Sequence, residues 1–390
     1  MAGETKEHPS SRLPGFFEGA GLAVTSLLVI LAALEGALRL WDWARGGTPL
    51  VKPDPQVVLY RPHPYLPIAL RPSSDYRDGD TSGRINSLGL RGPERTIEKP
   101  PGVLRVLCVG GSTTFGAGIL GDENTWPARL ESHLAAGWPN QRVEVWNAGV
   151  PGYTTAENII YLGLTLVDFH PDLVIFYEGY NDFKPNRHPG FRADYSHWRD
   201  RAAPPVRSPL ARLRLYEKLD KLARRFIRPP TAEVRDAATG AALKRYDTVS
   251  EEGLSVFRRN LHTLAAIARS AGARVAFATY AHPCTEANLE RHPDLFVYLP
   301  GFAPTLTFNG VRDAFRQYND STRAVAAEEH AILVDAEREI PPDPGLFVDH
   351  VHYNAAGADA FARVAAAALL PALRNPEFLR DGAAGPPARH

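Results

Sequence analysis

Ser112 is the residue whose surroundings best suit acyl-transfer chemistry. It follows Gly110 and Gly111 at the end of an apolar run, so its hydroxyl can be presented at a sharp turn. A free serine hydroxyl is a weak nucleophile and needs an adjacent base. The Gly-Gly-Ser turn could alternatively cradle a phosphate, but no Gly-Lys-Ser/Thr sequence follows it. Ser112 therefore predicts a nucleophile, provided that the fold brings a histidine to it.

Asp349 and His352 lie three residues apart near the C-terminus. A histidine can take up the serine proton near neutral pH. An acid at this spacing can bond one imidazole nitrogen, which fixes the tautomer and leaves the other nitrogen to act as the base. We therefore assign proton transfer to His352 and orientation to Asp349. His350 lies between them, and the three side chains could alternatively form a metal cluster.

The tetrahedral oxyanion of acyl transfer needs hydrogen-bond donors. We expect three of them: the backbone N–H groups of Ser112 and Gly152, and the side-chain amide of Asn181. Gly152 closes the segment 147–152, and Asn181 lies in the segment 179–182. Taken singly, each of these segments could be a turn or a helix cap. Their order along the chain is what makes them a candidate site.

The hydrophobic pattern indicates how these segments could meet. From about Val103, short apolar runs alternate with helical stretches, as in parallel α/β folds. The predicted strands are 104–109, 143–147, 173–177, 274–280 and 332–335. The predicted helices are 125–136, 154–168, 250–271, 310–329 and 355–370. Active groups of open parallel sheets gather at the carboxyl ends of the strands, where the candidate segments fall.

The composition excludes some classes of function. The chain has 390 residues, of which 44% are hydrophobic, enough for one substantial core. Lys and Arg total 44, as do Asp and Glu, so no net charge points to nucleic acid. The two cysteines, Cys108 and Cys284, leave the redox compartment undecided.

The N-terminal region predicts a transmembrane anchor over 19–41. Residues 19–34 carry no charge and would span roughly 24 Å as a helix. Extension to Leu38 supplies the roughly 20 residues that a bilayer requires, but includes Glu35, which could pair with Arg39. A cleaved signal peptide and a buried core helix are the alternatives. Basic residues are balanced on the two sides, so the charge pattern does not fix the orientation.

The remaining chain divides by composition. Residues 183–248 interrupt the alternation and predict an insertion. Within it, 208–228 predicts an amphipathic helix that could cover the mouth of the active site or dock elsewhere. The full division is an N-terminal tail 1–18, the anchor 19–41, a juxtamembrane linker 42–102, a catalytic domain 103–371 with its insertion, and a flexible tail 372–390.

The ordered segments resemble the SGNH subgroup of the GDSL lipases and esterases over about residues 103–371. That family is named for a Ser, a Gly, an Asn and a His in four ordered blocks. The matching residues here are Ser112, Gly152, Asn181 and His352, with Asp349 completing the Asp-x-x-His block. One position departs from the family, because Gly111 stands where the name-giving motif has Asp. The stretch 85–92 is also similar to anchored bacterial SGNH proteins.

The resemblance implies a flavodoxin-like three-layer α/β/α sandwich. This agrees with the five-stranded parallel sheet and the N-terminal transmembrane helix that the hydrophobic pattern predicts. It implies hydrolysis of carboxylic esters, expected to be acetyl esters, through an acyl-enzyme on Ser112, without a cofactor or a metal. The substrate would be a small-molecule or glycan ester, and the domain would lie in the periplasm or outside the cell. An O-acyltransferase acting on exported polysaccharide or lipid is one alternative. A non-catalytic surface binding protein on the same fold is another.

Overall fold

The computed structural model describes residues 14–44, 59–199, 215, 219 and 243–375. The helix α1 (Pro14–Ala44) and the α/β domain are separate units and are described one by one. Within α1, the stretch Gly21–Trp41 has a mean hydropathy of 2.1 and is not buried by other parts of the chain. Glu35 and Arg39 form the expected pair at 2.6 Å. By length and composition, α1 could be a membrane span or a signal sequence.

The α/β domain is built on five parallel strands in the order β6-β5-β7-β8-β9. Their bounds are β5 Val103–Gly110, β6 Arg142–Gly149, β7 Leu173–Tyr177, β8 Arg274–Ala278 and β9 Ile332–Val334. Every residue of β5 and of β7 is buried, as expected for strands that are covered on both faces. The five strands predicted from the sequence are thereby confirmed, with ends that shift by a few residues.

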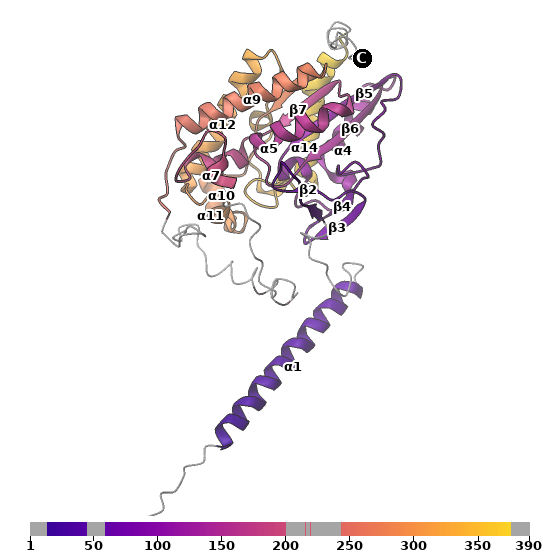
Figure 1. Ribbon diagram of the computed structural model, residues 1–390. Coiled ribbons are helices and arrows are strands. Elements are labelled where there is room, and N and C mark those ends of the chain that lie inside the picture. The colour runs from indigo at the N-terminus through magenta and orange to yellow at the C-terminus, as the bar shows by residue number, and fades with distance from the viewer. Residues whose placement is uncertain (1–13, 45–58, 200–214, 216–218, 220–242, 376–390) are drawn as a thin grey trace, which may run out of the picture. The chain divides into compact units, whose positions relative to one another are not determined.

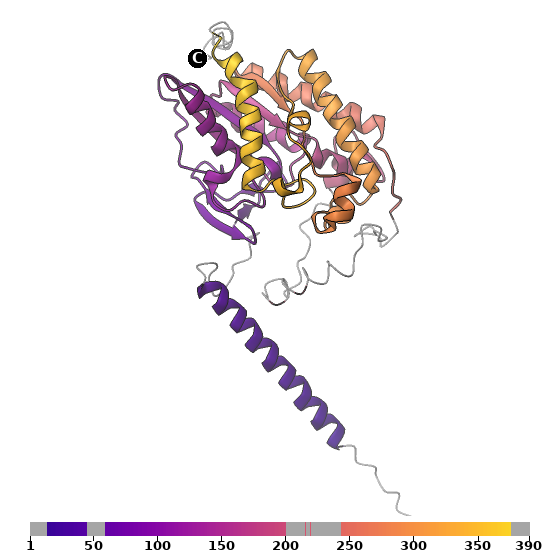
Figure 2. The same ribbon diagram turned by 180° about the vertical axis from the view of Figure 1, so that it is seen from behind.

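Five long helices cover the two faces of this sheet (Figures 1 and 2). They are α4 Trp126–Gly137, α5 Thr155–Leu164, α9 Glu251–Ser270, α12 Phe308–Glu328 and α14 Ala355–Leu373. Helices α4 and α14 pack together on one face, whereas α5, α9 and α12 pack on the other. The strand order and the two helical layers confirm the flavodoxin-like three-layer sandwich.

Polar side chains explain where the long helices begin. Thr154 caps α5 and forms a capping box with Glu157, so two N–H groups that lack helical partners are satisfied reciprocally. Ser250, Thr307 and Asn354 accept hydrogen bonds from the first turns of α9, α12 and α14. These caps fix the start of each helix close to the position that the sequence predicts.

Short helical turns connect these elements. The α-helical ones are α3 Ser112–Phe115, α6 Phe183–Asn186, α7 Ser196–Arg199, α10 Glu286–Arg291, α11 Leu299–Phe302 and α13 Ala336–Glu339. The 3-10 turns are η1 Asp122–Asn124, η2 Leu166–Phe169, η3 Tyr180–Asp182, η5 Pro293–Phe296 and η6 Pro344–Leu346. The two turns that matter most for the site are α3, after β5, and η3, after β7.

The segment 59–102, expected as part of a linker, is folded onto the domain. It forms two antiparallel hairpins, β1 (Tyr60–Arg61) with β2 (Ala69–Leu70), and β3 (Ser74–Asp78) with β4 (Thr81–Ile85). Their apolar side chains share a small second core with the loops after β5 and β6. This core contains Leu59, Leu66, Leu70, Tyr76, Ile85, Phe115, Val150 and Tyr153. The hairpins therefore support two of the loops that carry candidate site residues.

Only the two ends of the predicted insertion 183–248 are described. The first end contains α6 and α7, and the second returns through Tyr246, which bridges to Leu306. The amphipathic helix predicted over 208–228 lies outside the described residues, apart from 215 and 219. Its expected position over the active site therefore stays a prediction.

A buried acid lies directly after β7. Glu178 is 4% exposed and accepts a hydrogen bond from the amide of Asn158. Burial raises the pKa of Glu178 well above its usual range, and the nearby charge of Asp182 raises it further. The pKa of Asp182 is itself raised by burial to about 7, although Thr155 donates hydrogen bonds to its carboxylate. This part of the core therefore favours protonated carboxyl groups.

Glu178→Gln should stabilise the fold at high pH. Because the folded pKa of Glu178 lies above the unfolded value, the native protein loses stability as pH rises above that unfolded value. Glutamine keeps an acceptor for Asn158 and never ionises. At about pH 8, we expect the variant to unfold about 2–4 °C above the native chain in a thermal melt, with little difference at about pH 5. The exposed control Glu290→Gln should show neither effect, and an equal gain at both pH values would contradict a raised pKa.

Candidate active site

The three residues predicted as a triad are joined by hydrogen bonds. Ser112 begins α3 directly after β5, and His352 precedes α14. The Nε2 atom of His352 lies 2.7 Å from the Oγ atom of Ser112. The Nδ1 atom of the same ring lies 2.7 Å from Oδ2 of Asp349. The other carboxylate oxygen, Oδ1, accepts from the backbone N–H groups of Val351 and His352. The loop thus fixes the carboxylate, and the carboxylate fixes the ring.

Asp349 is held in its charged form. Burial works against ionisation, but the nearby imidazole and hydrogen bonds of His352 outweigh it and lower the pKa of Asp349 below its usual range. A carboxylate that stays ionised can accept the Nδ1 proton of His352 and stabilise the imidazolium that forms when Nε2 takes a proton. The arrangement is therefore suited to general-base catalysis at the Ser112 hydroxyl.

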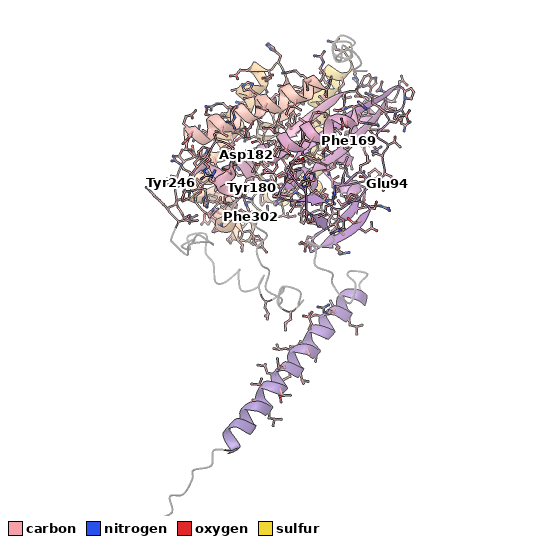
Figure 3. The ribbon with its side chains drawn as sticks, in the orientation of Figure 1. Glu94, Phe169, Tyr180, Asp182, Tyr246 and Phe302 are labelled. Carbon is pink, nitrogen blue, oxygen red and sulfur yellow. The ribbon has the colours of Figure 1, made fainter. Side chains whose placement is uncertain are left out.

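His350 points away from this chain of hydrogen bonds. Its Nε2 atom bonds the hydroxyl of Tyr180, and its ring packs against Tyr180 and Phe302 at 5.4 and 5.6 Å between centroids. Tyr180 and Phe302 are labelled in Figure 3. Burial lowers the pKa of His350 to about 4, so the ring is neutral at physiological pH. Within the described residues, no group of three or more His, Cys, Asp and Glu side chains is placed to hold a metal. The two histidines thus have separate surroundings.

The backbone N–H groups of Ser112 and Gly152, predicted as oxyanion donors, have no hydrogen-bond acceptor among the described residues. Ser112 is the first residue of α3, so its N–H has no partner within the helix. Gly152 adopts a φ of +88°, which disfavours any residue with a side chain. Both residues lie just beyond the ends of strands whose N–H groups are otherwise paired along the sheet. Both follow neighbouring strands, β5 and β6, as the sequence predicted.

Asn181 lies in η3 after β7 and is 6% exposed. Its Nδ2 atom donates to the carbonyl of Tyr153 at 2.8 Å, next to Gly152 in the chain. Its Oδ1 atom accepts from Lys184 Nζ at 3.1 Å. The amide therefore spans from the loop after β7 to the loop after β6. One of its two N–H groups is left to serve as a donor.

A side chain at position 111 would require the Asn181 amide to shift from its position in this structure. A Cβ atom at this position would lie only 2.5 Å from Nδ2 of Asn181 and 3.3 Å from the carbonyl oxygen of Tyr153. The Asn181 amide thus occupies the space into which a side chain at position 111 would extend. The glycine allows the amide to approach the nucleophile turn.

Arg91 supports the nucleophile turn, a role that its position in the sequence does not indicate. Its buried guanidinium donates to the carbonyls of Phe115 and Gly116, at the end of α3, at 2.9 and 2.8 Å. It also donates to the Ser82 carbonyl at 2.7 Å, and its Nε bonds the carboxylate of Asp122 at 2.8 Å. The segment 85–92 thus places the Arg91 guanidinium at the C-terminus of α3, where helix carbonyls lack partners within the helix.

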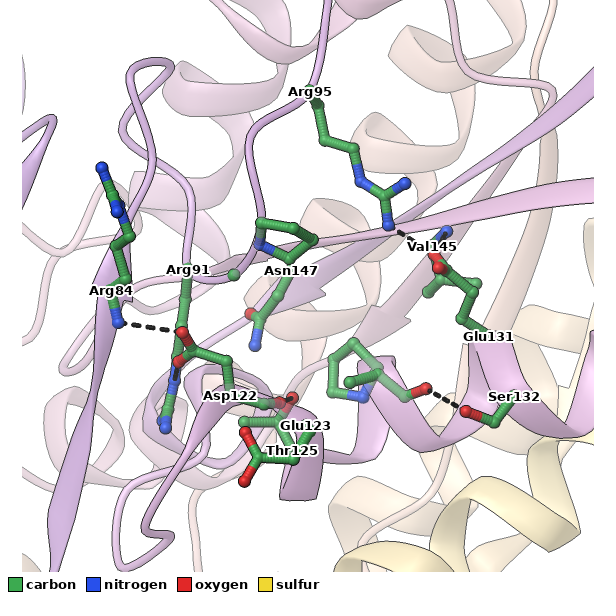
Figure 4. Close-up of a pocket in the computed structure, with 14 residues that line it drawn as sticks. Arg84, Arg91, Arg95, Asp122, Glu123, Thr125, Glu131, Ser132, Val145 and Asn147 are labelled. Atoms are coloured by element: carbon green, nitrogen blue, oxygen red, sulfur yellow. Dashed lines mark hydrogen bonds and ion pairs between the residues drawn. The ribbon is translucent and has the colours of Figure 1, made fainter.

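A pocket of about 420 Å³ borders this network (Figure 4). Arg91, Asp122 and Asn147 line one part of it, and Asn147 also donates to the Phe115 carbonyl at 3.2 Å. Its charged lining is balanced between arginines and acids, and it contains neither Ser112 nor His352. The pocket therefore lies behind the nucleophile turn rather than at the candidate site.

Comparison with known proteins places the chain in a family. The sequence matches the GDSL-like Lipase/Acylhydrolase family over residues 108–360. No curated protein matches the chain. Among solved structures, an α/β hydrolase from the metagenome of Lake Arreo, Spain, is 18% identical, with coverage of 68% of this chain and 94% of that one and a TM-score of 0.39.

Two acetylxylan esterases are similarly distant. One, AlAXEase, is 14% identical, with coverage of 68% and 100% of the two chains and a TM-score of 0.41. The other, from Geobacillus stearothermophilus, is 17% identical, with coverage of 74% and 97% and a TM-score of 0.38. The family match spans more than half of the sequence and includes the candidate residues Ser112 to His352. The chain belongs to the GDSL-like lipase/acylhydrolase family and is an ester hydrolase of the SGNH type.

Proposed function

We propose that the chain hydrolyses carboxylic esters, acetyl esters foremost, through an acyl-enzyme on Ser112. The observation that carries the proposal is the unbroken series of hydrogen bonds from Asp349 through His352 to Ser112. A serine in that position has a base within reach, and the base has an orienting acid. Ser112, Gly152 and Asn181 supply donors at the ends of three neighbouring strands.

The proposed reaction has two steps. As Oγ of Ser112 bonds to the carbonyl carbon, its proton passes to Nε2 of His352 and the carbonyl oxygen becomes an oxyanion. The two backbone N–H groups and the Asn181 amide bind that oxygen, while Asp349 stabilises the imidazolium. Collapse breaks the bond to the alcohol, which leaves with the proton from His352. Water, deprotonated by His352, then attacks the acyl-enzyme. Collapse breaks the ester bond to Ser112, whose Oγ takes the proton back from His352 as the acid leaves.

A series of aryl esters tests this activity. The full chain in detergent micelles should release para-nitrophenol from the acetyl ester, and kcat/KM should fall as the acyl group lengthens to octanoyl. The acetyl preference is what the family resemblance implies. Equal or greater rates on long acyl chains would contradict the acetyl assignment. If none of the esters were hydrolysed, the proposed hydrolase activity would be contradicted.

Restoring the family's usual aspartate at position 111 should damage the enzyme. Gly111→Asp would place a Cβ atom 2.5 Å from Asn181 Nδ2, and the hydrogen bonds of Asn181 resist displacement. We expect kcat to fall about 10²-fold or more, comparable to the loss of one oxyanion donor. A matched Gly152→Asp variant, strained by its positive φ, should also lose activity. Unchanged kcat in Gly111→Asp would show that the amide position is not required.

We also propose that α1 anchors the chain and holds the catalytic domain outside the cytoplasm. Support comes from the exposed apolar stretch Gly21–Trp41 and from the surface substrates that the resemblance implies. Protease added to spheroplasts should degrade the catalytic domain and leave cytoplasmic proteins intact. Protection of the domain until detergent is added would refute this orientation.

A further inference from the structure

Lys184 has unusual surroundings for a lysine. It lies in α6, three residues after Asn181, and its side chain is half-buried. The ammonium lies 5.2 Å from the ring centroid of Phe302 and 6.0 Å from that of Tyr180. Among the described residues, no carboxylate oxygen lies within 4.0 Å of its Nζ atom. Its hydrogen bond to Asn181, at 3.1 Å, is therefore its main polar contact there.

The partners of Asn181 fix the orientation of its amide. A lysine ammonium only donates hydrogen bonds, and a peptide carbonyl only accepts them. The amide oxygen must therefore face Lys184, and the amide nitrogen must face the carbonyl of Tyr153. A flipped amide would place two donors together on one side and two acceptors on the other. With this orientation fixed, Nδ2 lies beside Gly111 and keeps a second N–H that the Tyr153 carbonyl does not use.

We propose that Lys184 is a positioning residue for ester hydrolysis, which holds the oxygen of the Asn181 amide so that its nitrogen serves the oxyanion. The inference rests on the function proposed above and adds a residue to it. The ammonium also polarises the amide, because a hydrogen bond from a charged donor draws electrons toward the amide oxygen. The N–H that faces the oxyanion becomes a better donor as a result.

The energetics favour a functional reason for this lysine. Burial lowers the pKa of Lys184 to about 8, which means that the site disfavours the charge. A partly desolvated cation without a carboxylate partner lowers stability, and such groups concentrate at functional sites. The aromatic faces of Tyr180 and Phe302 offset part of that cost. A purely structural position could hold an apolar side chain instead.

Two variants separate the hydrogen bond from the charge. Lys184→Met removes both and keeps the length of the side chain, whereas Lys184→Gln keeps a neutral donor. With para-nitrophenyl acetate and the full chain in micelles, Lys184→Met should lower kcat about 10- to 100-fold and change KM less than about twofold. Lys184→Gln should lie between this variant and the native chain. The control Lys99→Met removes a lysine paired with Asp172, before β7, and should leave kcat unchanged.

A double-mutant cycle with Asn181→Ala tests whether Lys184 acts through the amide. In that background, Lys184→Met should change kcat by less than about twofold, because the group that it positions is gone. An equal loss in both backgrounds would overturn the proposal, as would a rise in KM at unchanged kcat. The latter result would assign Lys184 to substrate binding.

The activity of Ser112→Ala distinguishes a failure of the proposed ester hydrolysis from a failure of the positioning role of Lys184. If Ser112→Ala is inactive while folded Lys184→Met and Lys184→Gln keep the native kcat, only the positioning role fails. If Ser112→Ala stays active, the proposed function fails first. Circular dichroism and thermal melts of each variant show whether it is folded. If Lys184→Met does not fold, Lys184→Gln alone decides the test.

Discussion

Ser112→Ala is expected to lower kcat/KM for an aryl acetate by about 10⁴- to 10⁶-fold. The alanine removes the hydroxyl that we propose forms the acyl-enzyme, so the variant should retain only substrate binding and the proposed oxyanion donors. The Ser112 hydroxyl is half-buried at the start of a short turn, and its partner in the structure is the His352 ring. Removing it leaves no large cavity, and the fold should be unaffected.

The measurement is steady-state hydrolysis of para-nitrophenyl acetate by the native and variant chains. Ser270→Ala, at the exposed end of α9, is a matched control that removes another hydroxyl and should be fully active. Thermal melts should place both variants close to the native protein. Hydrolysis by Ser112→Ala at a rate like that of the native chain would exclude this serine as the nucleophile.

His352→Ala is expected to be nearly as damaging as Ser112→Ala. Without the imidazole, the serine proton has no acceptor, and the leaving alcohol has no donor. The two side chains form one unit, so the double variant should be little worse than either single variant. If the fall in kcat/KM of the double variant equalled the product of the two single falls, a shared function would be contradicted.

His350→Ala provides the internal control for that prediction. This histidine bonds Tyr180 rather than Ser112, and its neutral ring is packed in an aromatic cluster. Its removal should therefore lower the melting temperature while kcat falls far less than in His352→Ala. If His350 were the essential histidine, the assignment of the Asp349–His352 block would be wrong.

The fold could be predicted because its signals are local. The strands β5 and β7 are continuous buried runs, and the long helices begin at Ser, Thr or Asn caps. The alternation of such elements indicates a parallel sheet, and the strand order then follows the rules for right-handed crossovers. The hairpins over 59–85 were not predicted. Their strands are short and have little periodicity, and their apolar side chains are buried by contact with the loops after β5 and β6.

The site residues that could be predicted are those that form a recognisable pattern within a short stretch of sequence. The Asp-x-x-His block and the glycines before Ser112 are such patterns, and the structure brings Asp349, His352 and Ser112 within hydrogen-bond distance. Their catalytic roles remain the proposal. Arg91 carries no such signal, because its partners Phe115 and Gly116 lie 24 and 25 residues away. The sequence could likewise not show that Asn181 occupies the space beside Gly111, which only the three-dimensional contact reveals.

The most direct test of the central claim is to trap the nucleophile. A fluorophosphonate probe reacts with activated serine hydroxyls and leaves a stable phosphonyl adduct that mass spectrometry can locate. In the native chain, the adduct should lie on Ser112 alone. The variants Ser112→Ala and His352→Ala should not be labelled, because one lacks the hydroxyl and the other lacks the base. Labelling of a different residue, or undiminished labelling of Ser112→Ala, would contradict the proposed function.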